Sequence, residues 1–435
     1  MARGRIQVLA AFLVAVGLLA ASAGAAATPG DLSRFTGRAV PALGDDIWLS
    51  GPDTSAFPWP AVVAFNATDN EYLVVWVDRR SDGTRELDIY GRRVAADGSP
   101  LGADIRICGL GATTRDEGPA VVWNATDNEY LVVWQDRRNF DPRGIDIYGR
   151  LVGADGVPIG SDLRISGLLS QNEMSPALAW NATENEYLVV WADTRNWLTR
   201  GNDIYGRRVG SDGARLGPDF RITGNGGTGE EGRPAVVWNG TGYLVAWEDG
   251  RREATRGTDI YGRLVGADGS RPDPDFRING KGAIADDYEP AVAWNGTEYL
   301  VVWMDGRDYD SRDDDIYGRR LGADGSRLGA DLRVSGPGAT GDDFWPAVAW
   351  NDDDAYLVTW SDERNPASQA DARGRFVAAD GSRPEGDFRI NGSGVPADQY
   401  SGALVWNGSA GEFLAVWVDS RDGADWQVYG RRLAG

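Results

Sequence analysis

The chain has 435 residues, with 65 Asp and Glu against 44 Lys and Arg, one Cys and no His. The absence of His excludes a Ser-His-Asp or Cys-His catalytic apparatus and a His-ligated metal, and a single Cys excludes an internal disulfide. The formal charge of -21 argues against a nucleic-acid partner, because no basic surface would offset the phosphate charge.

The first residues predict an export signal. Arg3 and Arg5 precede an apolar run over residues 6–20, which is short for a membrane span, and the small residues 21–27 offer Ala-x-Ala cleavage sites. We therefore predict that residues 1–27 are a signal peptide. The mature chain is expected to be secreted and to carry no membrane span of its own.

After a short lead over residues 28–36, one sequence repeat fills a single domain over residues 37–435. The segment Tyr-Leu-Val-Val-Trp-x-Asp-x-Arg recurs with little change, at intervals of 56 to 58 residues. A fixed period of this length indicates a repeat architecture. The Trp of each copy marks seven units, at Trp76, Trp134, Trp191, Trp247, Trp303, Trp360 and Trp417.

Each unit contains four short apolar runs. In the second unit these are residues 119–124, 129–134, 146–152 and 162–167, all rich in β-branched and aromatic residues. Tight polar turns join the first run to the second and the third to the fourth, and Asp-Gly in the latter turn supplies the positive φ that a hairpin needs. Four antiparallel strands repeated seven times predict an all-β fold, a seven-bladed β-propeller.

The two ends of the repeat are complementary. The last unit stops at Leu433, after its third strand, and residues 46–51 near the other terminus match the missing fourth strand. We predict that this N-terminal strand completes the C-terminal blade, so that the ring is closed and its sheet edges are paired. An open array of repeats is the alternative.

A carboxylate stands three residues before the Pro that opens the first strand in five of the units. Because this loop leads into the innermost strand, the five side chains are expected to form a broken ring around the upper end of the central channel. Two interpretations stay open: a site for Ca²⁺ or a cationic group, since hard cations prefer oxygen ligands, or pairing of each acid with the Arg of Asp-x-Arg. The pattern assigns no catalytic residue and no cofactor. The ring candidates are Asp116, Glu173, Glu231, Asp287 and Asp343.

Aromatic residues outside the repeat mark a second set of positions. Thirteen of the 18 Trp belong to the first and second strands of the units and are expected in the core. Exposed rings beside carboxylates suit sugars, whose C–H faces stack on them, and the same rings also suit the packing of loops; both interpretations stay open. The ligand-binding candidates are Trp59, Trp197, Tyr288, Trp345, Tyr400 and Trp426.

The segments Tyr-Leu-Val-Val-Trp-x-Asp-x-Arg and Asp-Ile-Tyr-Gly-Arg together resemble the repeat of secreted bacterial β-propeller proteins, many of which have no assigned activity. The resemblance covers residues 37–435 and implies the propeller fold. The repeat is only loosely similar to that of the sialidase-type Asp-box propellers. Their box, Ser-x-Asp-x-Gly-x-Thr-Trp, places the Trp after the Asp, whereas here the Trp precedes it, so no catalytic residue is carried over.

Three functions fit these patterns. Regular repeats without a catalytic irregularity favour a secreted, monomeric, non-enzymatic protein that recognises an extracellular glycan or protein through its upper loops. The alternative is a propeller glycoside hydrolase or lyase that uses two of the upper carboxylates, and acids fully paired with Arg would argue against it. The third is a structural component of the cell surface or matrix.

Overall fold

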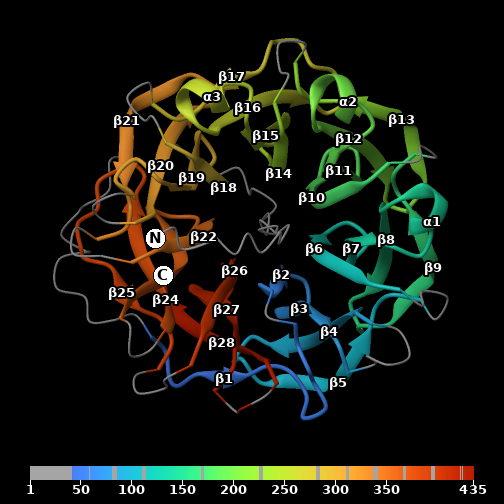
Figure 1. Cartoon of the computed structure of the whole chain (residues 1–435). Coiled ribbons are helices and arrows are strands. Elements are labelled where there is room, and N and C mark those ends of the chain that lie inside the picture. Colours follow the sequence, from blue (N-terminus) through green and yellow to red (C-terminus); the bar gives the residue numbers. More distant parts are fainter. Residues whose placement is uncertain are drawn as a thin grey trace, which may run out of the picture.

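Seven four-stranded antiparallel sheets are arranged as blades around a central axis (Figure 1). The computed structural model describes residues 42–435, except residues 58, 81–85, 110–113, 168–170, 225–228, 281–284, 310–312, 337–340, 366–368, 393–396, 422 and 424. The predicted signal peptide and lead, residues 1–36, lie outside the described residues. The seven-bladed β-propeller predicted from the sequence is confirmed.

Within each of blades 1 to 6, the strands lie from the axis outwards in the order in which they occur in the chain. The innermost strands are β2 (Val62–Asn66), β6 (Asp116–Asn124), β10 (Glu173–Asn181), β14 (Glu231–Trp238), β18 (Asp287–Trp294), β22 (Asp343–Trp350) and, in blade 7, β26 (Gln399–Asn407). The second strands are β3 (Glu71–Asp78), β7 (Glu129–Asp136), β11 (Glu186–Asp193), β15 (Gly242–Asp249), β19 (Glu298–Asp305), β23 (Ala355–Asn365) and β27 (Glu412–Asp419).

The outer half of each blade contains the third and fourth strands. The third strands are β4 (Asp88–Ala95), β8 (Asp146–Gly153), β12 (Asp203–Gly210), β16 (Asp259–Gly266), β20 (Asp315–Gly322), β24 (Gln369–Ala378) and β28 (Gln427–Ala434). The outermost strands are β5 (Pro100–Arg106), β9 (Pro158–Arg164), β13 (Arg215–Arg221), β17 (Phe276–Arg277), β21 (Arg327–Arg333), β25 (Phe388–Arg389) and, in blade 7, β1 (Ile47–Trp48).

Among the described residues, single-turn helices follow the second strand in blades 2, 3 and 4, as α1 (Phe140–Arg143), α2 (Trp197–Arg200) and α3 (Glu253–Arg256). Across the described ranges, no helix has the length and apolar character needed to cross a membrane.

Burial between neighbouring blades explains the repeated apolar segment. The second strand of each blade is covered on both faces, so its sequence reads as a continuous apolar run instead of an alternation. The seven repeat Trp side chains are at most 1% exposed. Because truncation of a buried side chain of this size costs about 3–5 kcal/mol, these rings anchor the core of every blade.

The last blade combines the two ends of the chain. β1 pairs antiparallel with β28, with Ile47 opposite Gly430. The N–H of Leu49 donates a hydrogen bond to the carbonyl oxygen of Val428 at 2.9 Å, and the Leu49 side chain is completely buried. The prediction that residues 46–51 complete the C-terminal blade is confirmed.

Leu49→Ala is expected to lower the free energy of unfolding by about 2–5 kcal/mol, because it leaves a cavity beside the strand that closes the ring. Leu43→Ala is the matched control, since this side chain is 36% exposed and its truncation should cost less than about 1 kcal/mol. Chemical denaturation followed by tryptophan fluorescence measures both variants. Equal and small effects would contradict a closure that depends on β1.

Candidate functional site

One Asp organises the upper edge of each blade, where the innermost strand begins and the second strand ends. In blade 2, Asp136 accepts hydrogen bonds from Trp134 Nε1 at 3.2 Å and from the N–H of Arg138 at 2.7 Å. The guanidinium of Arg138 lies 2.6 Å from Asp136 and 2.6 Å from Asp162 on the outermost strand. Asp162 in turn accepts the N–H of Gly109 from blade 1 at 3.0 Å. The motif therefore joins the second strand to the outer strand and to the preceding blade.

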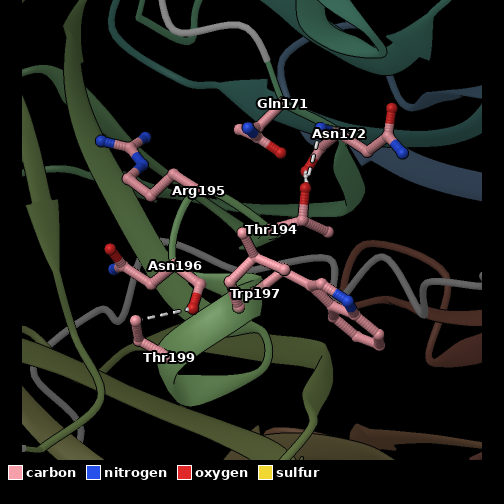
Figure 2. A pocket seen from close by; sticks show the side chains of 8 residues that line it. Gln171, Asn172, Thr194, Arg195, Asn196, Trp197 and Thr199 are labelled. Carbon is pink, nitrogen blue, oxygen red and sulfur yellow. Dashed lines mark hydrogen bonds between the residues drawn. The ribbon is translucent and has the colours of Figure 1, made fainter.

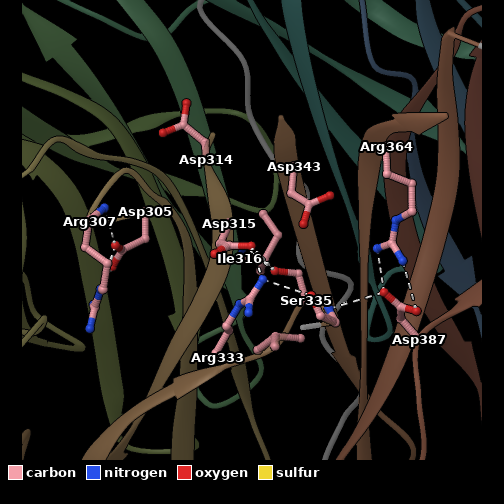
Figure 3. Close-up of polar contacts among 12 residues, drawn as sticks. Asp305, Arg307, Asp314, Asp315, Ile316, Arg333, Ser335, Asp343, Arg364 and Asp387 are labelled. Carbon is pink, nitrogen blue, oxygen red and sulfur yellow. Dashed lines mark hydrogen bonds and ion pairs between the residues drawn. The ribbon is translucent and has the colours of Figure 1, made fainter. Parts of the chain in front are cut away.

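The same network recurs around the ring. In the last blade Asp46, from the N-terminal end of the chain, supplies the outer carboxylate to Arg421 and accepts the N–H of Gly392. In six blades the Arg also lies 3.8–4.2 Å from the centre of the Tyr ring of strand three. Figure 3 shows the outer contact of this network in blade 6, where Arg364 reaches Asp387. The other equivalent pairs are Arg80–Asp104, Arg195–Asp219, Arg251–Asp275 and Arg307–Asp331.

The five predicted ring carboxylates lie beside these Asp residues, each at the first residue of an innermost strand. Asp116 is opposite Asp136 in the sheet, and Glu173 is opposite Asp193. All five side chains are at most 1% exposed. Neither carboxylate oxygen of Asp116 or Glu173 has a hydrogen-bond partner among the described residues. The structure thus places these acids inside the blade edge, shielded from solvent.

Burial shifts the protonation of these acids. It raises the pKa of Glu173 to about 8 and that of Glu231 to about 9. Burial, together with the neighbouring carboxylate of Asp362, raises the pKa of Asp343 to about 10. The last blade has the neutral Gln399 at this position, hydrogen-bonded to Asn391. Glu173, Glu231 and Asp343 are therefore expected to be uncharged at neutral pH.

Because the folded chain retains protons that the unfolded chain releases, its free energy of unfolding is expected to fall as the pH rises from about 4.3 towards the Glu173 pKa of about 8. Glu173→Gln mimics the protonated acid, so it should raise stability at about pH 8 and leave it nearly unchanged at about pH 4. The matched control is Glu184→Gln at an exposed position. Urea denaturation at both pH values measures the effect, and a loss of stability in Glu173→Gln at the higher pH would contradict the assignment.

A β-bulge follows the ring position in six of the innermost strands. The residue two positions after the acid has a left-handed backbone in five of them, with φ between 42° and 57°. Bulges re-aim side chains and occur next to active sites, and a non-Gly residue in this conformation costs about 1–3 kcal/mol. Unlike the acid before it, this residue differs in character from blade to blade: Gly118, Ser175, Arg233, Glu289 and Trp345.

Three of the bulge residues and one residue at the end of β15 form a hydrogen-bonded chain that we name the axial cluster: Arg233, Glu248, Glu289 and Trp345. Arg233 Nη1 lies 2.9 Å from Glu248 Oε1, and the same oxygen accepts the N–H of Glu289 at 2.7 Å. Trp345 donates its N–H at 3.1 Å and its indole Nε1–H at 2.9 Å to the two oxygens of Glu289. The cluster thus crosses blades 4, 5 and 6 at the innermost strands β14, β18 and β22 (Figure 1).

Two of the predicted aromatic residues, Tyr400 and Trp426, lie beside a third, Trp345 of the axial cluster. Tyr400 packs against Trp345 with 5.1 Å between ring centres and stacks on Trp426 at 5.1 Å. These rings are partly exposed, as is Tyr288, which precedes Glu289 in the chain. The result is an aromatic surface next to the carboxyl group of Glu289, an arrangement suited to a sugar.

The other two predicted aromatic residues lie elsewhere. Trp59 is 8% exposed and packs edge-on against Phe57, with 4.6 Å between ring centres. Trp197 is 50% exposed on α2, where it lines a cavity of about 730 Å³ together with Gln171 and Asn172 (Figure 2). Trp59 therefore belongs to the core, and Trp197 belongs to a separate surface of blade 3.

The two carboxyl groups of the axial cluster have different surroundings. Glu248 forms an ion pair with Arg233, whereas burial raises the pKa of Glu289 to about 6 despite the opposing charge of Arg233. Carboxyl groups whose environments differ in this way can divide the roles of acid and base. Sequence reasoning missed both residues. The sequence did contain a signal for Glu289. It directly precedes Pro290, and the residue at this position changes strongly from unit to unit.

No protein-family model matches the chain, and comparison with curated proteins gives no match. Among solved structures, it is similar to a protein of unknown function from Dyadobacter fermentans, with 13% identity and a TM-score of 0.50 over 73% of this chain and 94% of that one. A puromycin hydrolase mutant gives 14% identity and a TM-score of 0.55 over 89% of this chain and 55% of that one. An α-L-arabinofuranosidase from Fusarium graminearum gives 11% identity and a TM-score of 0.49 over 91% of this chain and 98% of that one.

Glycoside hydrolases recur among these neighbours, as arabinofuranosidase, arabinanase and sialidase propellers. These neighbours do not support the expectation of a non-enzymatic binding protein, which is withdrawn, and the alternative of a glycoside hydrolase is taken up below as a proposal. At these identities the likeness itself shows the propeller fold alone, and no family match supports the specific repeat motif. The activity of the chain has to follow from its own side chains.

Proposed function

We propose that the chain is a glycoside hydrolase with its catalytic centre at the axial cluster. The observation that supports this most is the pair Glu248 and Glu289, which meet at one blade boundary and differ in their surroundings. Glycoside hydrolysis uses two carboxyl groups, one of which protonates the leaving oxygen while the other acts as nucleophile or base. Glu289, with its raised pKa, is assigned as the acid, and Glu248 takes the second role.

The neighbours of the two carboxyl groups act as positioning residues. Arg233 fixes Glu248 through the 2.9 Å ion pair, and Trp345 fixes both oxygens of Glu289. Rigid placement of this kind is what a two-carboxylate mechanism requires, because small displacements lower its rate strongly. The rings of Tyr400 and Trp426 offer a stacking surface for the sugar.

The predicted signal peptide over residues 1–27 leads to a second part of the proposal, that the mature chain is secreted and acts on an extracellular polysaccharide. Arabinan, arabinoxylan and sialylated oligosaccharides make a first substrate panel, because they cover the sugars for which neighbouring propellers are named. Release of reducing sugar or sialic acid by the purified chain tests the activity directly.

Glu289→Gln is expected to lower kcat/KM about 10²–10⁴-fold on any substrate that the wild-type chain hydrolyses, because the leaving oxygen loses its acid. Glu248→Gln should cause a loss of similar size through the attacking step. Steady-state kinetics measure both, and near-ultraviolet circular dichroism checks that the variants keep the packing of their aromatic residues.

Glu173→Gln is the matched control for these variants, because Glu173 is a buried ring acid that the proposal leaves out of the chemistry. Its turnover should equal that of the wild type. Activity lost in Glu173→Gln but kept in Glu289→Gln would move the catalytic site to the ring acids. No hydrolysis across the panel by the wild-type chain would contradict the proposed function, and unsaturated products would identify a lyase instead.

The pH profile gives an independent test. With the Glu289 pKa raised to about 6, kcat/KM is expected to fall as the pH rises above this value, because the acid is then deprotonated in the free enzyme. The residual activity of Glu289→Gln should lack this fall. A wild-type profile that stays flat from about pH 5 to about pH 8 would argue against Glu289 as the acid.

A further inference from the structure

The junction between blades 1 and 2 contains the single Cys of the chain. The Cys108 Sγ atom and one carboxylate oxygen each of Asp88 and Asp116 lie within 4.8 Å of one another. Asp88 begins β4 and Asp116 begins β6, and the three side chains are 0–2% exposed. At the other junctions the residue equivalent to Cys108 is Ser50, Ser166, Thr223, Asn279, Ser335 or Asn391.

Hydrogen bonding distinguishes Cys108 from its equivalents. Thr223 donates from Oγ1 to Asp203 at 3.0 Å, and Ser335 donates from Oγ to Asp315 at 3.1 Å. The corresponding distance from Cys108 Sγ to Asp88 Oδ1 is 3.5 Å, and a thiol is a weak donor. The Cys therefore contributes less hydrogen bonding than Ser or Thr, and it adds a soft ligand atom.

Three carboxylate oxygens around Cys108 are left without hydrogen-bond partners in the described part of the chain, whereas Oδ1 of Asp88 accepts a hydrogen bond from Arg106. Neither oxygen of Asp116 has one among the described residues, nor does Oδ2 of Asp88, although both side chains are completely buried. A desolvated carboxylate without a partner is costly, and a cation bound by several ligands removes that cost. The N–H of Ile89 donates a hydrogen bond to Cys108 Sγ at 3.3 Å, so the sulfur is held beside the two carboxylates.

We propose that Asp88, Cys108 and Asp116 bind one Zn²⁺ ion at the junction of blades 1 and 2. In a tetrahedral site with Zn–S of about 2.3 Å and Zn–O of about 2.0 Å, the two ligand atoms are about 3.5 Å apart. The distance between Cys108 Sγ and Asp88 Oδ1 has this value, 3.5 Å. A thiolate among the ligands selects Zn²⁺ over Ca²⁺, which prefers oxygen alone.

The charges around the site leave room for a divalent cation. When ionised, the three ligands and the neighbouring Asp136 carry four negative charges. Arg106 pairs with Asp88 at 2.6 Å and Arg138 pairs with Asp136 at 2.6 Å. Because Arg138 is shared with Asp162 at 2.6 Å, these two guanidinium groups leave an excess of negative charge that a bound divalent cation reduces.

The test measures the metal content of the untagged full-length chain, produced with Zn²⁺ in the growth medium and then desalted. Because the chain has no His, imidazole sites do not compete. We expect about one Zn²⁺ per chain in the wild type and none in Cys108→Ser. This variant should fold, because blades 2 and 5 carry Ser166 and Ser335 at the same position. Ser335→Ala, which changes the equivalent residue of another junction, should keep the full content.

Cobalt provides a second readout that does not depend on the variant. The chain produced with Co²⁺ is expected to show a thiolate-to-metal charge-transfer band in the near ultraviolet, which a ligand set without sulfur does not give. Excess Ca²⁺ should leave the band unchanged. Wild-type chain without bound Zn²⁺, equal metal content in Cys108→Ser, or the absence of the cobalt band would each overturn the proposal.

Discussion

A buried carboxylate is tolerated only when its charge is compensated, and the upper edge of each blade is built around that requirement. The Asp of Trp-x-Asp-x-Arg is completely buried or nearly so, and it receives an indole N–H, a backbone N–H and a guanidinium. The guanidinium is held by an outer Asp, which accepts an N–H from the preceding blade. One buried charge thus fixes strand two, the outer strand and the neighbouring blade together. The contacts share the same two carboxylates and one guanidinium, and the motif recurs as a unit in all seven blades.

The residues that stabilise the blades are different from the residues that form the axial cluster. The repeat Trp residues and the Asp–Arg contacts stabilise each blade, so the bulge of the innermost strand is free to differ between blades. A rigid frame can hold side chains such as Arg233, Glu289 and Trp345 in a left-handed backbone that would be unfavourable in isolation. The axial cluster depends on this rigidity, because its hydrogen bonds join three different blades.

The architecture was predictable because it depends on periodicity, which a sequence displays directly. The seven Trp residues give the number of blades, and residues 46–51 show how the ring closes. The site was harder to predict from the sequence, because a bulge adds one residue to a strand and changes which side chains face the axis. The sequence analysis chose the acid three residues before the Pro, which is Asp116 or its equivalent and lies in the blade edge. It therefore missed Glu289, which directly precedes the Pro. Likewise, nothing local separates the core residue Trp59 from Trp345 of the axial cluster, since both directly precede a Pro.

The repeats also provide a natural substitution series at a single position. The ring position holds Asp in three blades, Glu in two and Gln in one, always in a similar buried setting. Gln399 carries no charge at this position in blade 7. It nevertheless accepts a hydrogen bond from Asn391, as Asp287 accepts one from Asn279 in blade 5. The fold therefore does not require a charged group at this position. At the position of Glu248, blade 2 has Gln135, whose Oε1 accepts the N–H of Ser175 at 3.1 Å in the same way. Glu289 has no such equivalent, because the other blades carry chemically different residues at its position. The carboxyl group of Glu289 is therefore specific to one blade boundary and is not demanded by the fold.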